Sequence, residues 1–128
     1  GVDGAPQETF DQKRGLFQKY IPVLRALAQV SWEPVTYGTA EPEGTIIERF
    51  GGENGRPLFF TVRNTQQNVQ DVSVTIDGEA LGLTSSKRLS VLDVLTDNEV
   101  PLGKSEKTGQ LSCALRVPGQ TTVVLSVK

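Results

Sequence analysis

The chain has 128 residues, a formal net charge of −2 and 37% hydrophobic residues, which is the composition of a globular domain with one hydrophobic core. It contains no histidine and one cysteine, which excludes Ser-His-Asp and Cys-His catalytic relays, histidine-containing zinc sites and an internal disulfide. Because methionine is absent, including at position 1, we expect the chain to be an excised part of a longer protein.

The charge pattern bears on possible partners. A nucleic-acid binder is expected to carry a clustered basic face, whereas the basic residues near the start are accompanied by Glu8 and Asp11, as on a solvated helix. No apolar run approaches the roughly 18 to 20 residues of a membrane span. We therefore expect neither nucleic acid nor membrane as a partner. The first residues lack a signal-peptide pattern, but in an excised chain this leaves both cytoplasmic and secreted locations open.

An amphipathic helix is predicted over residues 9–30, after a disordered or tag-derived leader at 1–8. Thr9 is placed to cap it, and its apolar residues recur at helical spacing on one stripe. Pro22 lies within this stretch and should kink the helix or divide it in two. The members of the stripe, which we expect to pack on another domain or on the rest of this chain, are Phe10, Phe17, Ile21, Leu24 and Ala28.

After Val30 the hydrophobic period changes from 3.6 to 2, which predicts half-buried antiparallel strands over residues 31–128. Regular alternation marks strands over 58–63, 72–77, 111–117 and 123–127, and less regular candidates lie over 32–37, 45–50 and 89–95. Turn residues separate them, and no helix is predicted between them. The fold class expected is mainly β, an antiparallel two-sheet β-sandwich of about seven to eight strands, Greek-key-like, with the kinked helix at its N-terminal end.

Two dipeptides predict specific turns. Asp77-Gly78 suits a type I′ hairpin that would pair the strand before it with residues 80–83. Pro118-Gly119 suits a type II turn between the last two strands.

Three side chains have predictable positions in this sandwich. Phe59 and Phe60 are adjacent in a strand and must point to opposite faces, so one of them needs cover, which the helix can supply. Cys113 alternates with Leu111 and Leu115 on an apolar strand face and is expected to be a buried core thiol.

Candidate catalytic and metal-binding groups are weak. The carboxylates of Glu33, Glu48, Asp77 and Asp93 lie in or beside strands but form no strand-end cluster, so we expect them to be solvated or salt-bridged. The acidic residues around Asp97 lack the ligand spacing of a calcium loop, and the glycines of 51–55 are followed by a strand rather than by a phosphate-binding helix. No catalytic residue, metal or cofactor is therefore predicted.

Trp32 and Tyr37 are the candidate ligand-binding residues, because sugar rings stack on exposed aromatic faces in many β-sandwich modules. The alternative for Trp32 is that it anchors the helix to the sandwich, and this is the interpretation that we favour.

Three stretches carry a family resemblance. Leu16 to Pro22, continuing to Ser31–Tyr37, resembles the last helix and exit segment of a TIM-barrel glycoside hydrolase. Glu48–Gly51 followed by Phe59–Asn64 is similar to the opening strands of the β-sandwich that such enzymes carry after the barrel. The segment 91–97, then 109–111 and 117–125, resembles its closing strands, with Val94 and Asp97 in place of the Leu and Gly of the usual pattern.

The resemblance implies a non-catalytic C-terminal accessory domain whose partner is an upstream catalytic barrel of the same chain. The catalytic carboxylates would lie in that barrel, so this chain itself is not expected to be an enzyme. Two alternatives remain open: a carbohydrate-binding module, with carbohydrate as the partner, and an immunoglobulin-like spacer or adhesion module.

Overall fold

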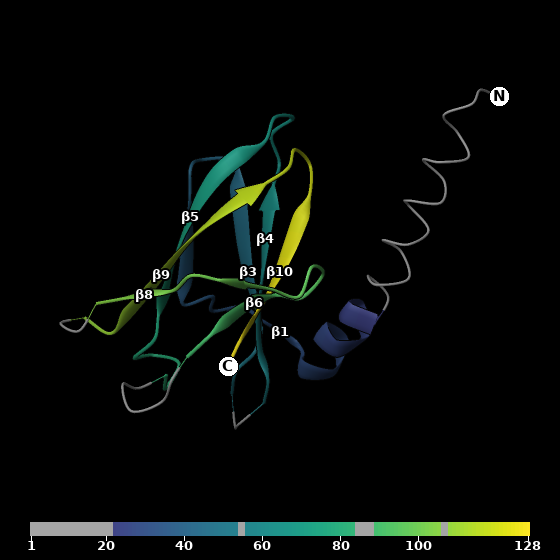
Figure 1. Cartoon of the computed structure of the whole chain (residues 1–128). Helices are drawn as coiled ribbons and strands as arrows, with labels where there is room; N and C mark the ends of the chain where they lie inside the picture. The colour runs from purple at the N-terminus through teal and green to yellow at the C-terminus, as the bar shows by residue number, and fades with distance from the viewer. Residues whose placement is uncertain (1–21, 54–55, 84–88, 106–107) are drawn as a thin grey trace.

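A computed structural model describes residues 22–53, 56–83, 89–105 and 108–128 of the chain. Its strands form two antiparallel sheets, which confirms the predicted mainly β, two-sheet sandwich (Figure 1). The larger sheet contains, in spatial order, β1 (Trp32–Glu33), β3 (Thr45–Gly51), β4 (Leu58–Asn64), β10 (Thr122–Val127), β6 (Val91–Asp93) and β7 (Asn98–Val100). The smaller sheet contains β2 (Gly38–Glu41), β5 (Gln70–Asp77), β9 (Gln110–Val117) and β8 (Gly103–Lys104).

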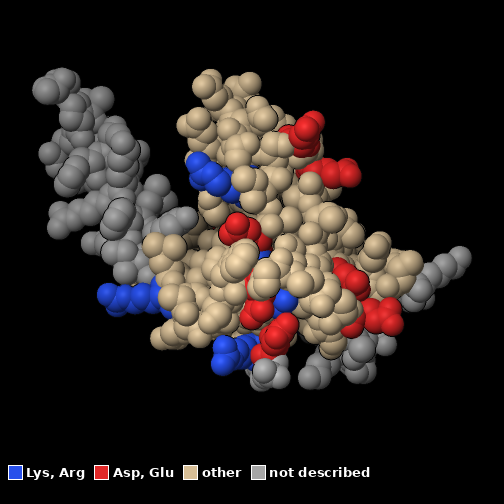
Figure 2. Space-filling view, turned by 180° about the vertical axis from the view of Figure 1, so that it is seen from behind, with Lys and Arg blue, Asp and Glu red and all other residues tan. Residues whose placement is uncertain are grey.

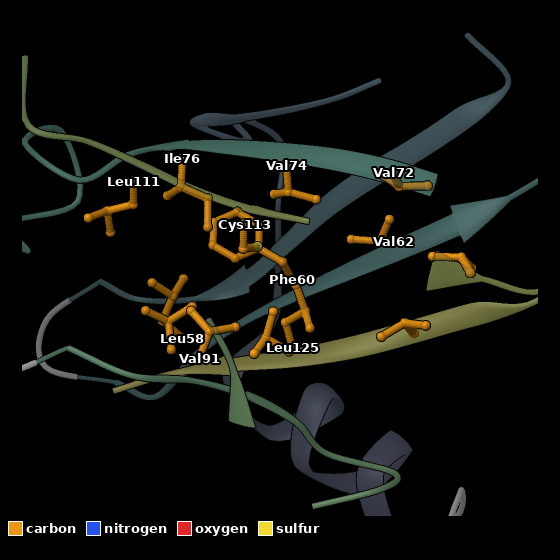
Figure 3. Close-up of a cluster of buried hydrophobic side chains, with 14 residues drawn as sticks. Leu58, Phe60, Val62, Val72, Val74, Ile76, Val91, Leu111, Cys113 and Leu125 are labelled. Carbon is orange, nitrogen blue, oxygen red and sulfur yellow. The ribbon is translucent and has the colours of Figure 1, made fainter. Parts of the chain in front are cut away.

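The core lies between the two sheets and is built from alternate residues of their long strands. Figure 3 shows side chains of β5 and β9 facing those of β4, β6 and β10. Phe60 and Leu125 are opposite each other on β4 and β10, and both are fully buried. Cys113 belongs to the same cluster, as its alternation predicted. Burial of each large apolar side chain contributes roughly 1.5 to 3 kcal/mol, so this cluster is the main source of stability.

The outer face of the six-stranded sheet is covered in part by a helix over residues 22–30. Val23 and Leu27 of this helix pack with Val124 of β10, and Phe59 is among the partly buried residues against them. The prediction that Phe59 and Phe60 point to opposite faces, with a helix covering one of them, is therefore confirmed.

The helix does not use the predicted stripe to pack on the sheet. Its buried residues are Val23, Leu27 and Val30, whereas Leu24 is 48% exposed and Ala28 is also exposed. Val23 and Leu27 are four residues apart and share the side of the helix that faces the sheet. Leu24 and Ala28 are also four residues apart, so they share the adjacent side, which we call the flank of the helix. The other predicted stripe members, Phe10, Phe17 and Ile21, lie outside the described residues, as do most of the predicted helix over 9–30, the leader 1–8 and the N-terminal side of the expected kink.

The two turn predictions are wrong. After β5, residues 78–82 form successive turns instead of a hairpin: Ala80 N–H donates to the Asp77 side chain and Leu81 N–H to the Asp77 carbonyl. Gly78 is absent from the positive-φ glycines, so the type I′ geometry does not occur. Both edges of β5 are already paired, with β2 and β9, which leaves no place for a hairpin partner.

The connection after β9 joins the two sheets and is not a type II turn. Its positive φ, 53°, falls on Gln120 rather than on Gly119. Gly119 is required for a different reason, since a Cβ there would lie 1.9 Å from the Gln67 carbonyl oxygen. The chain passes so close to the β4–β5 connection because β9 and β10 belong to opposite sheets.

Candidate functional site

Trp32 begins β1, the edge strand of the six-stranded sheet. It is opposite Phe50 of β3, and residues opposite each other in an antiparallel pair point to the same face. Phe50 packs on the helix side, so Trp32 also lies on the outer face. Its side chain is 54% exposed and belongs to neither hydrophobic cluster. This exposure contradicts the interpretation of Trp32 as an anchor between helix and sandwich.

Tyr37 lies between β1 and β2 with a left-handed backbone, φ 53°. Its carbonyl oxygen accepts the Asp77 N–H at 2.8 Å, and its ring lies over the Arg49 guanidinium, 5.1 Å from the Arg49 Cζ atom to the ring centroid. This distance is that of a cation–π contact. Tyr37 is 38% exposed, and one of its ring faces is occupied by Arg49.

Arg49 is the residue of this region that the sequence analysis missed. It lies on β3 and is 1% exposed. Its Nε donates to the Val35 carbonyl at 2.9 Å and its Nη1 to the Gly51 carbonyl at 2.6 Å, while Nη2 lies 3.5 Å from the Glu53 carboxylate. A guanidinium satisfies several acceptors at once, so Arg49 holds the connection after β1 against β3. The period-2 pattern of residues 46–51 could have placed Arg49 inward, but an inward charge is contrary to the usual composition of a core.

The structure does not bring Trp32 and Tyr37 together into one ligand platform. Trp32 lies on the outer face of the β1–β3 pair with Phe50, whereas Arg49 follows the opposite alternation and Tyr37 stacks on Arg49. The backbone of the sheet therefore separates the two aromatic rings. Trp32 is accessible to a ligand, and the ring of Tyr37 is engaged in stacking on Arg49.

Three surface hollows among the described residues differ from a glycosidase active site in their lining. One, at an end of the sandwich, is lined by Arg56, Lys128 and a group of leucines. A second lies on the larger sheet against Phe59 and Leu92, and a third lies on the smaller sheet around Cys113. None of these three is lined by a carboxylate. A glycosidase mechanism requires two, so these hollows do not resemble a hydrolase active site.

The thiol of Cys113 and the acidic side chains of the described residues were the other groups with catalytic or metal-binding potential. Burial raises the pKa of the Cys113 thiol, which disfavours the nucleophilic thiolate. Within the described ranges no group of three or more acidic or cysteine side chains could hold a metal ion. On the face seen in Figure 2, the lysine and arginine side chains are separated from one another, and acidic side chains lie over its middle and one side.

In the part of the chain that the structure describes, we find no helix with the length and hydropathy that a membrane crossing needs. Comparison of the sequence with protein-family models and with curated proteins gave no match.

Proposed function

We propose that this chain is a non-catalytic C-terminal β-sandwich domain of a glycoside hydrolase-like protein, and that it packs on the catalytic domain through the exposed flank of its helix. The proposal combines the sequence resemblance with one structural observation, which is that the helix is apolar on two sides. Val23 and Leu27 bury one side against the sheet, and Leu24, 48% exposed, belongs to the other.

The composition of the helix supports a position between two domains, the sandwich and the proposed catalytic domain. Its polar residues are Arg25 and Gln29, which lie four residues apart and therefore on the same side. A surface helix of a free domain is expected to be polar over its whole outer side. Here the outer side is divided between this polar strip and the apolar flank of Leu24 and Ala28, which a second domain can cover.

The first test is to sequence the gene upstream of the codon for Gly1. We expect a (β/α)₈ barrel with two carboxylates at its active site, and a coding region without such a domain would refute the proposal. Purified as it stands, this chain should show no turnover of aryl glycosides; measurable hydrolysis would contradict the non-catalytic assignment.

The contact itself is tested in the longer protein. Leu24→Asp should lower its melting temperature and increase hydrogen exchange over residues 22–30, because a charge enters the domain interface. Val69→Asp is the matched control, since Val69 is also half-exposed, at 50%, but lies in the β4–β5 connection. Equal effects of the two changes would refute the contact.

A second candidate is the immunoglobulin-like spacer or adhesion module, because the helix already packs on a sheet of this same chain. A spacer should be stable alone and insensitive to its neighbours. For this candidate, hydrogen exchange over residues 22–30 is the same in this chain and in the longer protein, whereas the accessory-domain proposal requires slower exchange in the longer protein.

A further inference from the structure

Trp32 has the most exposed aromatic side chain of the described structure, and the packing of the fold does not explain this exposure. Tryptophan is usually largely buried because of its apolar area, yet Trp32 is 54% exposed. Its strand, β1, is at the edge of the six-stranded sheet and has β3 as its one neighbour there. Trp32 therefore presents an indole to solvent from an edge strand of the sheet.

An acidic residue, Glu48, lies on the same face of the sheet as Trp32. Phe50 is directly opposite Trp32, and Glu48 precedes Phe50 by two residues, so Glu48 shares the face and occupies the position diagonal to Trp32. Diagonal neighbours in an antiparallel pair are separated by about 7 to 8 Å, which long and aromatic side chains can span. Glu48 is exposed, so its carboxylate is accessible to the same ligand as the indole.

From this arrangement we propose that Trp32 and Glu48 form a binding site for a neutral sugar on the outer face of the six-stranded sheet. The C–H face of a pyranose ring is apolar and packs on the flat indole, while its hydroxyl groups at the ring edge donate hydrogen bonds to the carboxylate of Glu48. Hydrogen bonds to an ionised acceptor are stronger than neutral ones. The same negative charge repels sugars that carry carboxylate or sulfate groups, so the ligand class is neutral.

The edge position of β1 in the sheet bears on the form of the ligand. In the described structure no strand lies beyond β1 in this sheet, so a sugar stacked on Trp32 can be one unit of a chain that continues past the edge. A polysaccharide thus fits better than a monosaccharide held in a closed pocket. This site does not depend on the proposed accessory role, since it uses the sheet edge and not the helix flank.

The test is native affinity electrophoresis of this chain in gels that contain a soluble neutral polysaccharide. Hydroxyethyl cellulose, xyloglucan, mixed-linkage β-glucan and galactomannan form the panel, and polygalacturonate is the anionic comparison. We expect at least one neutral polymer to retard the chain and polygalacturonate not to do so. Absence of retardation by the whole neutral panel, or stronger retardation by polygalacturonate, would overturn the proposal.

Variants identify the residues responsible. Trp32→Ala should weaken retardation by about tenfold or more, as expected for loss of an aromatic stacking contact, and Trp32→Phe should restore part of it. Glu48→Gln should weaken it several-fold. Val69→Ala, a half-exposed position away from the site, is the control and should leave binding unchanged. Retardation that survives Trp32→Ala undiminished would refute the site.

Fluorescence supplies a second readout, because Trp32 is the one tryptophan of the chain. The retarding polysaccharide should protect it from acrylamide quenching, at a lower concentration for the wild type than for Glu48→Gln. Binding without such protection would place the ligand elsewhere and would also overturn the proposal.

Discussion

The hydrogen bonds of the buried Asn64 side chain lead to a direct test of what holds the two sheets together. It is fully buried at the end of β4, and its Nδ2 lies 2.8, 3.0 and 3.2 Å from the carbonyl oxygens of Asn68, Val117 and Pro118. Its Oδ1 accepts the Gln66 N–H at 2.9 Å. Because Val117 ends β9, this one amide joins the ends of strands from both sheets.

Asn64→Asp preserves the shape of the side chain but replaces its donor with an acceptor. The two N–H groups of the amide disappear, and a carboxylate oxygen then faces three carbonyl oxygens. Each buried polar group left unpaired costs about 1 to 3 kcal/mol, so two lost donors predict a destabilisation of about 4 kcal/mol at pH 7. This is a large part of the roughly 5 to 15 kcal/mol that stabilises a domain.

The loss should depend on pH with a definite sign. Burial and the facing carbonyls raise the pKa of the introduced carboxyl in the folded state, while its pKa in the unfolded state stays ordinary. Stability from the protonated form, whose O–H donates to one carbonyl, is present at low pH and is lost as the pH rises through the raised folded pKa. The difference from wild type should therefore be smaller at pH 4 than at pH 7.

Urea denaturation followed by far-UV circular dichroism at these two pH values measures the effect. Asn68→Asp is the control, because Asn68 is exposed and contributes its backbone carbonyl to this network. If Asn64→Asp unfolds within about 0.5 kcal/mol of wild type at both pH values, a change typical of an ordinary surface site, the reasoning is refuted.

Three further experiments, with four substitutions, test other parts of the fold. Arg49→Met should lower the free energy of unfolding in urea by about 2 kcal/mol, because two carbonyl acceptors lose their donor while the cost of burying a charge is relieved. An unchanged urea midpoint would count against the role of Arg49 in holding the connection after β1 against β3. Gly119→Ala should lower the melting temperature by several degrees, since its Cβ would overlap the Gln67 carbonyl; a melting curve like that of wild type would show that this approach is not as close as described. Leu27→Ala should lower the free energy of unfolding by about 2 to 3 kcal/mol and Leu24→Ala by less than about 1 kcal/mol, because Leu27 is 5% and Leu24 48% exposed. A larger effect of Leu24→Ala would indicate that the helix packs through the predicted stripe, which contains Leu24.

The strands were predictable where alternation alone decides the structure. The regular pattern around Phe59 and Phe60 gave their opposite orientations, since successive side chains of a strand must alternate. The turns were less predictable because their geometry depends on which strands are available to pair. Asp77-Gly78 has the composition of a hairpin turn, yet β2 and β9, which are distant in sequence, occupy both edges of β5. No local pattern contains that information.

The candidate site also depends on long-range contacts that no local sequence pattern contains. Exposure of Trp32 could not be derived from its sequence context, because it depends on β1 being an edge strand and on where the helix ends. Arg49 was missed because its burial depends on acceptors from Val35 and Gly51 and on the ring of Tyr37, which converge only in the folded chain. Tryptophan is usually buried and arginine usually exposed, whereas here Trp32 is exposed and Arg49 is buried.

The place of β10 in the larger sheet has a consequence for how the chain folds during synthesis. It is the last of the described strands in sequence, yet it lies between β4 and β6 (Figure 1). Until residues 122–127 leave the ribosome, β4 has an unpaired edge and β6 has no partner on that side. Such edges invite pairing with other chains, so the nascent domain is exposed to aggregation during this interval. Ribosome-bound chains that stop before Thr122 should accordingly remain open, and those that include Val127 should close the sheet.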